Sequence, residues 1–192
     1  MSHWRIQQSG HLVVNSSMLS WQVNPCWGAY SATKAALDRL IQAFAQESAI
    51  TAPGVKTLVF NPGFFRTPIT NADKCNYPKD SKHYQQLSDM YRGLSDSMEG
   101  KQPGDPGKLV KIVVDIVRGE GVAKGRDVPD FLPFGRDAVE SITGFTETMK
   151  NAWREWQDVI LSTDFDDGRN VNAAVLSVAD GVHGNGVELS GH

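Results

Sequence analysis

The sequence predicts an α/β fold built on a partial, doubly wound (Rossmann-like) parallel sheet of about three strands with flanking helices. Three short apolar runs, at residues 11–17, 55–60 and 131–134, have the length and composition of buried strands. Segments with helical apolar spacing separate them, at 31–50 and again at 105–119. Strands that alternate with helices in this way are typical of parallel sheets.

Composition limits the class of protein. A chain of 192 residues, 40% hydrophobic and 21% charged, is an ordinary single globular domain. The net charge of −3 without a basic block argues against a nucleic-acid partner. No apolar run is long enough to span a membrane. The two cysteines and five scattered histidines lack metal-ligand spacing, so we expect no metal site. The two cysteines also make no disulfide framework, so we expect a protein of the reducing cytoplasm.

The first third of the chain contains a strand, a loop and a long helix. Residues 1–9 are polar and indicate either the end of a helix or a disordered tail. After the strand at 11–17, the loop 18–28 is rich in Trp, Pro and Gly, with Trp21 and Trp27 as apolar covers. The apolar positions that follow at helical spacing are Leu37, Leu40, Ile41, Phe44 and Ala45.

Proline and glycine divide the rest of the chain. Pro53 and Gly54 end the helix, and the strand 55–60 leads into Asn61-Pro62-Gly63. The polar segment 69–104 holds a helical pattern at 81–99, which is typical of a surface helix.

The last helices begin at acidic residues. Asp105 is an N-cap followed by Pro106 at the first helical position, and this helix ends at Gly119. The run Phe131–Phe134 contains a proline, which places it at a sheet edge. Asp137 opens a further helix that continues to Leu161. We therefore predict a domain over residues 1–165 and an irregular or disordered tail over 166–192.

Three side chains near the first strand are suited to proton transfer. Ser17 ends that strand, and Tyr30 and Lys34 are four residues apart, so a helix presents them on one face. A free phenol ionises near pH ~10, too high for a base at neutral pH, and a nearby ammonium favours the ionised form. A hydroxyl beside the phenol can hold a substrate oxygen. The three residues suit carbonyl reduction or alcohol oxidation.

Two other interpretations of these residues stay open. A Tyr-x-x-x-Lys pair arises by chance in many helices, where the tyrosine is a packed aromatic. Ser31 and Lys34 also form the Ser-x-x-Lys motif of acyl-serine enzymes, but that class needs Ser-Asp-Asn and Lys-Thr-Gly partners that this chain lacks.

The order of these motifs resembles the second half of the short-chain dehydrogenase/reductase family. The matching features are the strand with Asn15-Ser16-Ser17, the pair Tyr30 and Lys34, and the segment Asn61–Thr67 after the next strand. The resemblance implies that Tyr30 is the acid/base, that Lys34 assists it and binds the nicotinamide ribose, and that Ser17 anchors the substrate oxygen. Its implied nicotinamide contacts are Pro62, Gly63, Phe65 through its backbone, and Thr67.

The resemblance also implies an activity and partners. It implies an NAD(P)-dependent interconversion of a small-molecule carbonyl and alcohol, with NADP slightly preferred over NAD. It further implies a homodimer through the helix that follows Tyr30. The segment 69–104 is the substrate lid in the family, so a lid is the alternative to a plain surface helix there, with Tyr77, Tyr84, Met90 and Tyr91 as candidate substrate contacts. Ser20 stands where family members usually carry glycine, so the loop after Ser17 turns differently here.

The glycine-rich turn that binds the cofactor pyrophosphate in this fold is not found after any predicted strand. The glycines at 181–186 open no helix. We therefore expect the N-terminal half of the fold to be missing and the chain to be a truncated oxidoreductase, which binds NAD(P) poorly and self-associates when it is isolated. The alternative is a non-catalytic remnant that acts as a dimerisation or interaction module.

Overall fold

A computed structural model describes residues 2–70 and 82–165. Its helices are α1 (Ser2–Gln7), α2 (Gly28–Thr51), α3 (Gln85–Met98), α4 (Pro106–Arg118), α5 (Arg136–Glu155) and α6 (Gln157–Leu161). Its strands are β1 (Gly10–Asn15), β2 (Val55–Pro62) and β3 (Phe131–Phe134). Three short 3-10 helices complete the fold: η1 (Met18–Ser20), η2 (Pro68–Thr70) and η3 (Gly121–Ala123).

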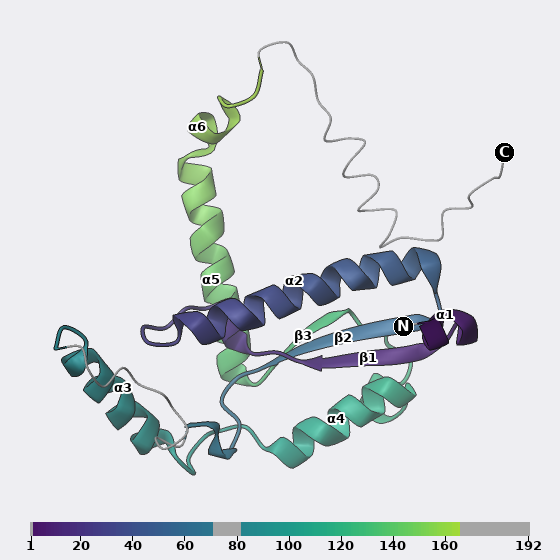
Figure 1. The fold of residues 1–192 in the computed structure, drawn as a ribbon, viewed down its shortest axis with the longest axis horizontal. Helices are drawn as coiled ribbons and strands as arrows, with labels where there is room; N and C mark the ends of the chain where they lie inside the picture. The colour runs from purple at the N-terminus through teal and green to yellow at the C-terminus, as the bar shows by residue number, and fades with distance from the viewer. Residues whose placement is uncertain (1, 71–81, 166–192) are drawn as a thin grey trace.

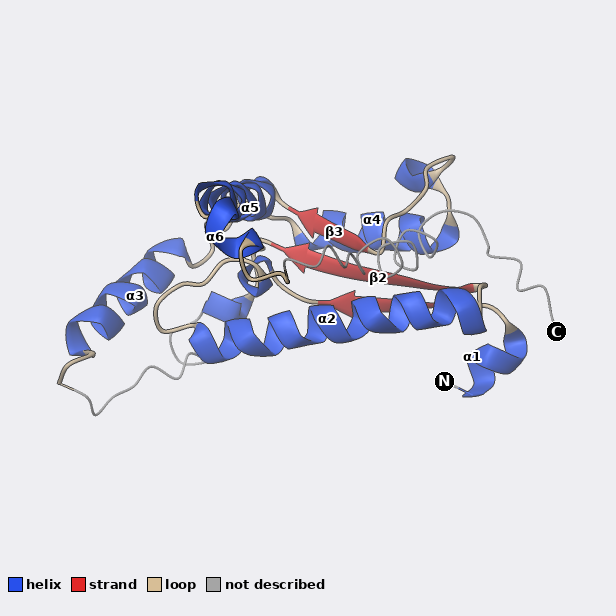
Figure 2. Ribbon diagram, turned by 90° about the horizontal axis from the view of Figure 1, so that it is seen from above, coloured by secondary structure: helices blue, strands red, loops and turns tan. Residues whose placement is uncertain are grey.

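The strands form one parallel sheet in the order β1-β2-β3, which confirms the predicted fold class. Val13 lies opposite Leu58, and Val59 opposite Phe131. The strand with Pro133 is at the edge, as its proline predicted. Figure 1 shows α2 along one face of this sheet and α4 along the other, and Figure 2 shows the three strands side by side.

Successive side chains of β2 point to opposite faces of the sheet, as in any β-strand. Val59 and Asn61 are fully buried, and the Asn61 side chain bonds to Asp38 of α2. Phe60, between them in the sequence, instead lines a cavity together with Leu109 of α4. The carboxyl end of β2 therefore contacts α2 on one face and borders an open space on the other.

A small apolar cluster joins the first turn of α5 to this end of the sheet. Ala138 is fully buried and packs with Met18 and Leu19 of η1. The partly buried rings of Trp27, Tyr30 and Phe64 pack against the same cluster. The rest of α5 and α6 extend away from the sheet (Figure 1). Only the start of α5 therefore helps to build the region around Tyr30.

Several element boundaries differ from the prediction. The helix predicted from Ser31 begins at Gly28, so Tyr30 lies in the first turn of α2. The strand predicted to end at Phe60 continues to Pro62. The last predicted helix divides at Trp156 into α5 and α6.

The buried face of α2 is also rotated from its predicted position. Leu40, expected to be buried, is 66% exposed. The buried positions of α2 include Asp38, Ile41, Ala45 and Ser48, at spacings of three and four residues. Asp38 is tolerated there because its carboxylate accepts a hydrogen bond from Asn61, which offsets part of the cost of burying a charge. The prediction used apolar positions alone, so it did not include Asp38 in the buried face.

The ends of α4 match their prediction. The Asp105 carboxylate accepts hydrogen bonds from the backbone N–H groups of Gly107 and Lys108, at 2.8 and 3.2 Å. Gly119 ends the helix in the left-handed conformation at φ 65°. Across residues 2–70 and 82–165, no helix has the length and apolar character needed to span a membrane. The tail predicted for 166–192 lies outside the described residues.

Candidate active site

A cavity of about 520 Å³ opens at the carboxyl ends of β1 and β2. This volume lies within the range of roughly 300–1,000 Å³ that is usual for small-molecule sites. Parallel sheets of this class bind their ligands at this edge. Each of the predicted site residues lines the cavity: Ser17, Tyr30, Lys34, Pro62, Gly63, Phe65 and Thr67.

Ser17 follows β1 and caps η1. Its backbone is extended, and its Oγ accepts a hydrogen bond from the N–H of Leu19 at 3.2 Å. The side chain is nearly buried. Among the described residues Ser17 Oγ donates no hydrogen bond, so its hydroxyl hydrogen is available to donate into the cavity.

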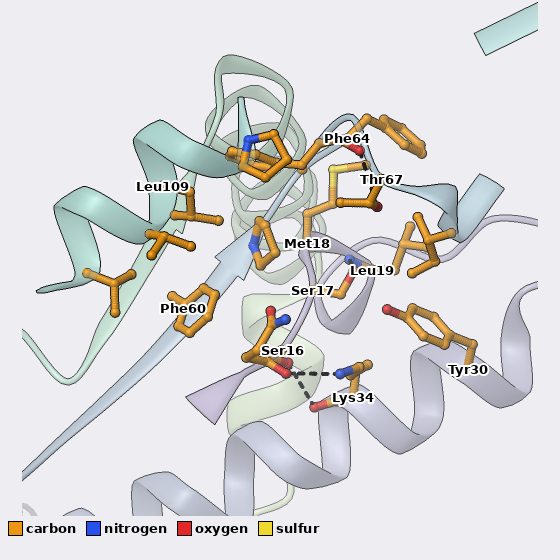
Figure 3. Close-up of a pocket in the computed structure, with 18 of the residues that line it drawn as sticks. Ser16, Ser17, Met18, Leu19, Tyr30, Lys34, Phe60, Phe64, Thr67 and Leu109 are labelled. Atoms are coloured by element: carbon orange, nitrogen blue, oxygen red, sulfur yellow. Dashed lines mark hydrogen bonds between the residues drawn. The ribbon is translucent and has the colours of Figure 1, made fainter. Parts of the chain in front are cut away.

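Tyr30 and Lys34 reach the cavity from α2. The Tyr30 ring packs edge-on against Trp27, with 5.5 Å between the ring centroids. Figure 3 shows its hydroxyl directed toward Ser17. One helical turn later, the Lys34 Nζ lies 5.8 Å from the centroid of the Tyr30 ring. The spacing of four residues therefore brings the phenol and the ammonium together beside the serine.

The Lys34 ammonium is held by the end of β1. It donates a hydrogen bond to the carbonyl of Asn15 at 2.9 Å, and Ser16 Oγ donates a long one to the Lys34 carbonyl at 3.5 Å (Figure 3). An ammonium carries three donors. Within the described part of the chain, the Asn15 bond is the one hydrogen bond from Nζ, which leaves two N–H groups for a ligand.

The turn after β2 forms the facing wall. Gly63 N–H donates to the carbonyl of Phe134 in β3 at 2.9 Å. Further along, Thr67 N–H donates to the carbonyl of Phe65 at 2.7 Å. These bonds hold the backbone from Pro62 to Thr67 across the cavity from Tyr30.

A buried polar network beneath the cavity was missed by the sequence analysis. The Asn61 side-chain amide lies within hydrogen-bond distance of three acceptors: the Ser17 carbonyl at 2.9 Å, Ser20 Oγ at 2.8 Å and Asp38 Oδ2 at 2.9 Å. Ser20 Oγ also donates to the Ser17 carbonyl at 2.8 Å. The spacing of Tyr30, Lys34 and Asp38, four residues apart each time, was the signal that places them on one face of α2.

The network explains the serine at position 20. Its hydroxyl takes part in the bonds that hold the backbone of Ser17, a role that glycine has no side chain to fill. The departure from the family pattern therefore adds a fixed contact to the loop.

Other predicted residues lie elsewhere. Trp27 lines the cavity. Trp21 does not, and its ring packs against that of Phe131 with 5.2 Å between the ring centroids. The candidate substrate contacts Tyr84, Met90 and Tyr91 do not line this cavity, and Tyr77 lies outside the described residues. Ser31, the serine of the acyl-serine interpretation, is buried in α2 and is not part of the cavity wall.

The residues present fit the nicotinamide end of a dinucleotide. They offer two free ammonium N–H groups at Lys34, the Tyr30 hydroxyl and a backbone turn after β2 that lines the cavity. A pyrophosphate needs a glycine-rich turn between a strand and a helix. In residues 2–70 and 82–165, the strand that runs most directly into a helix is β3, through Gly135 into α5. There the carboxylate of Asp137 occupies the turn, which opposes an anion.

Comparison with known proteins supports one family. Residues 1–77 match the sequence profile described as short chain dehydrogenase. The structure is similar to a crystal structure of a short-chain dehydrogenase from Streptomyces avermitilis, with a TM-score of 0.69 and 30% sequence identity. The sequence profile, the solved structure and the relatives below all support the short-chain dehydrogenase family for this chain. The match covers 85% of this chain and 56% of the Streptomyces chain.

Two sequence relatives agree with this assignment. The chain is 27% identical to Oxidoreductase BOA17 of Botryotinia fuckeliana (strain B05.10) over 159 residues, which are 83% of this chain and 55% of that protein. It is 26% identical over 92 residues to the uncharacterized oxidoreductase SSP1627 of Staphylococcus saprophyticus, covering 48% of this chain and 35% of that one. The chain thus spans about half the length of the first relative.

Proposed function

We propose that this chain is an NAD(P)-dependent oxidoreductase of the short-chain dehydrogenase type, which interconverts a carbonyl and an alcohol. The observation that supports this most is the convergence of Ser17, Tyr30 and Lys34 on one cavity, with the Tyr30 hydroxyl directed toward Ser17 (Figure 3). A hydroxyl donor and a phenol with a nearby ammonium are the groups that proton transfer to a carbonyl oxygen requires.

A bound nicotinamide would supply the hydride to the substrate carbon, or accept it in the reverse direction. In reduction, Tyr30 donates its phenolic proton to the substrate oxygen. Ser17 donates a hydrogen bond to the same oxygen and so fixes its distance from the phenol. The Lys34 ammonium then stabilises the negative charge left on the Tyr30 oxygen, since a nearby opposite charge favours the ionised form.

The cavity wall indicates the substrate class. Its other lining side chains include Met18, Leu19, Phe60, Phe64 and Leu109, which are apolar. Sites of this kind bind an apolar body and orient it with a few polar groups at one end. We therefore propose a ketone or secondary alcohol with an apolar body as the substrate.

The remaining parts of the proposal concern the cofactor, the assembly and the compartment. Lys34, Tyr30 and the backbone from Pro62 to Thr67 would hold the nicotinamide and its ribose, with NADP preferred over NAD. The exposed face of α2 would form a homodimer, and the protein would act in the cytoplasm. The nicotinamide contacts and the homodimer are what resemblance to the family implies, and the exposed Leu40 of α2 is available for the interface.

The test is NADPH oxidation by the purified chain with a panel of apolar ketones, together with calorimetric titration of NADPH. Tyr30→Phe should lower turnover at least 100-fold, because it removes the acid that protonates the substrate oxygen. Tyr84→Phe is the matched control. Tyr84 is the exposed N-cap residue of α3, so this variant should keep full activity.

Two results would replace the proposal. No turnover and no NADPH binding by the wild type would favour the non-catalytic interaction module. Loss of a hydrolytic activity in Ser31→Ala, with full activity in Tyr30→Phe, would favour the acyl-serine class.

A further inference from the structure

The carboxylate of Asp137 lies between the turn that follows β2 and the turn that follows β3. It accepts a hydrogen bond from the backbone N–H of Phe64 at 2.6 Å. A Cβ added to Gly63 would overlap this carboxylate, and one added to Gly135 would lie 2.6 Å from its Oδ1. The two glycines therefore leave the space that the carboxylate fills.

This contact is placed to be strong. Hydrogen bonds to an ionised acceptor are shorter than neutral ones and roughly twice as strong. Asp137 is the second residue of α5, where the positive end of the helix dipole favours a carboxylate. The neighbouring Gly63 N–H donates to the Phe134 carbonyl at 2.9 Å, so β3 and α5 hold consecutive backbone groups of the turn.

The other side of the turn is tied to the segment before α4. Gly104 N–H donates to the carbonyl of Phe64 at 3.0 Å, and Arg66 N–H donates to the carbonyl of Gly104 at 2.9 Å. The peptide groups on both sides of Phe64 are thus fixed. Without the Asp137 bond, one of these two restraints would be lost on the wall that faces Tyr30.

The support for Asp137 is itself anchored near Tyr30. The next residue, Ala138, is fully buried against Met18 and Leu19, in the cluster that Tyr30 and Phe64 also contact. A movement of Asp137 would therefore disturb the packing of Ala138. The first turn of α5 connects the Tyr30 side of the cavity to the turn on the facing side.

We propose that Asp137 is a positioning residue, whose carboxylate holds the Pro62–Phe65 turn at the distance from Tyr30 that a nicotinamide ring requires. This inference rests on the proposed function, because it assigns the turn to the nicotinamide side of the cavity. It gives a role to Asp137, which lies 73 positions after its hydrogen-bond partner Phe64 in the sequence.

The experiment compares Asp137→Ala and Asp137→Asn with Asp115→Ala. Asp115 is a matched control, because its carboxylate packs against Gly121 and accepts the N–H of Val122 at 3.3 Å, away from the cavity. Both alanine variants remove a carboxylate that holds a backbone turn. They differ in which turn is released.

The first readout does not depend on activity. In ¹H–¹⁵N spectra, the Phe64 amide should shift upfield in Asp137→Ala and exchange with solvent at least tenfold faster. Asp115→Ala should leave this amide unchanged. Asp137→Asn should restore most of the protection, because its side-chain oxygen still accepts the bond, and it covers the case in which the alanine variant fails to fold.

The second readout separates positioning from stability. Asp137→Ala should raise the Kd for NADPH and for the smaller probe reduced nicotinamide mononucleotide at least tenfold, while kcat at saturating NADPH changes less than threefold. Asp115→Ala should lose stability without a change in either Kd. Equal effects of the two alanine variants on Kd, or an unchanged Phe64 amide in Asp137→Ala, would overturn the inference.

The failure of the proposed function looks different. If the wild type binds neither NADPH nor the mononucleotide, the nicotinamide assignment is wrong and the positioning role falls with it. The Phe64 amide would still report whether Asp137 holds the turn.

Discussion

The side-chain amide of Asn61 donates a hydrogen bond to the carboxylate of Asp38 at 2.9 Å, in a region where both side chains are buried. Asn61 belongs to β2, and Asp38 lies one helical turn after Lys34 in α2. The same amide reaches the carbonyl of Ser17. One asparagine therefore connects the strand end, the helix that carries Tyr30 and Lys34, and the segment that carries Ser17.

Asn61→Leu should destabilise the protein by about 3 kcal/mol, because it leaves the Asp38 carboxylate buried without this donor. Asp38→Asn should cost less, about 1 kcal/mol, since an amide oxygen can still accept the bond. Urea denaturation measures both. Asn151→Leu, at an exposed site on α5, is the control and should stay within about 0.5 kcal/mol. Equal losses in the two leucine variants would contradict the network.

Ser31→Ala should leave the free energy of unfolding unchanged or raise it by up to about 1 kcal/mol. The Ser31 hydroxyl is buried and has no hydrogen-bond partner within the described part of the chain. Removing a buried, unsatisfied hydroxyl relieves its desolvation cost. Thermal and urea unfolding check this, and a loss above 1 kcal/mol would mean that the hydroxyl has a partner. Ketone reduction should also persist in this variant.

Ser17→Ala should lower kcat/KM for the ketone about 100-fold, because it removes a donor aimed at the substrate oxygen. The Kd for NADPH should change less than threefold, since the hydroxyl does not reach the cofactor in the proposed arrangement. Steady-state kinetics and calorimetry measure the two effects. Ser97→Ala, on the exposed side of α3, is the control. A larger effect on NADPH binding than on kcat/KM would assign Ser17 to the cofactor instead.

Leu40→Lys tests the proposed homodimer through α2. Leu40 is exposed, and a lysine there would place a charge in an apolar interface. The mass by light scattering should fall from dimer toward monomer, with little change in the far-ultraviolet circular dichroism. Val122→Lys replaces an exposed valine in η3 and should keep the dimer. An unchanged mass for Leu40→Lys would place any association on another surface.

Local sequence patterns were enough to predict the arrangement of the main helices and strands. The three apolar runs became parallel strands, and the cap at Asp105 and the stop at Gly119 bound α4 as predicted. These succeed because the signals lie within a few residues of the structure that they specify. The placement of Ser17, Tyr30 and Lys34 at one cavity also followed, since one pair is set by helical spacing and the third by the end of a strand.

Contacts between distant residues were not readable in the same way. No local pattern marks Asp38 as buried, because its burial depends on an asparagine that the fold brings beneath it. Asp137 resembled the start of a helix, and its partner Phe64 lies on another element. The exposure of Leu40 follows from the same rotation of α2 that buries Asp38.

By itself, the sequence determined the α/β class, the parallel strands and the residues that supply a phenol, an ammonium and a hydroxyl. The tertiary structure decided which buried polar groups hold them, through Asn61 with Asp38 and through Asp137 with Phe64. The physical reason is that periodicity records the environment of neighbouring residues along one element. A buried hydrogen bond across two elements depends on where the folded chain places a donor and an acceptor that no local pattern pairs.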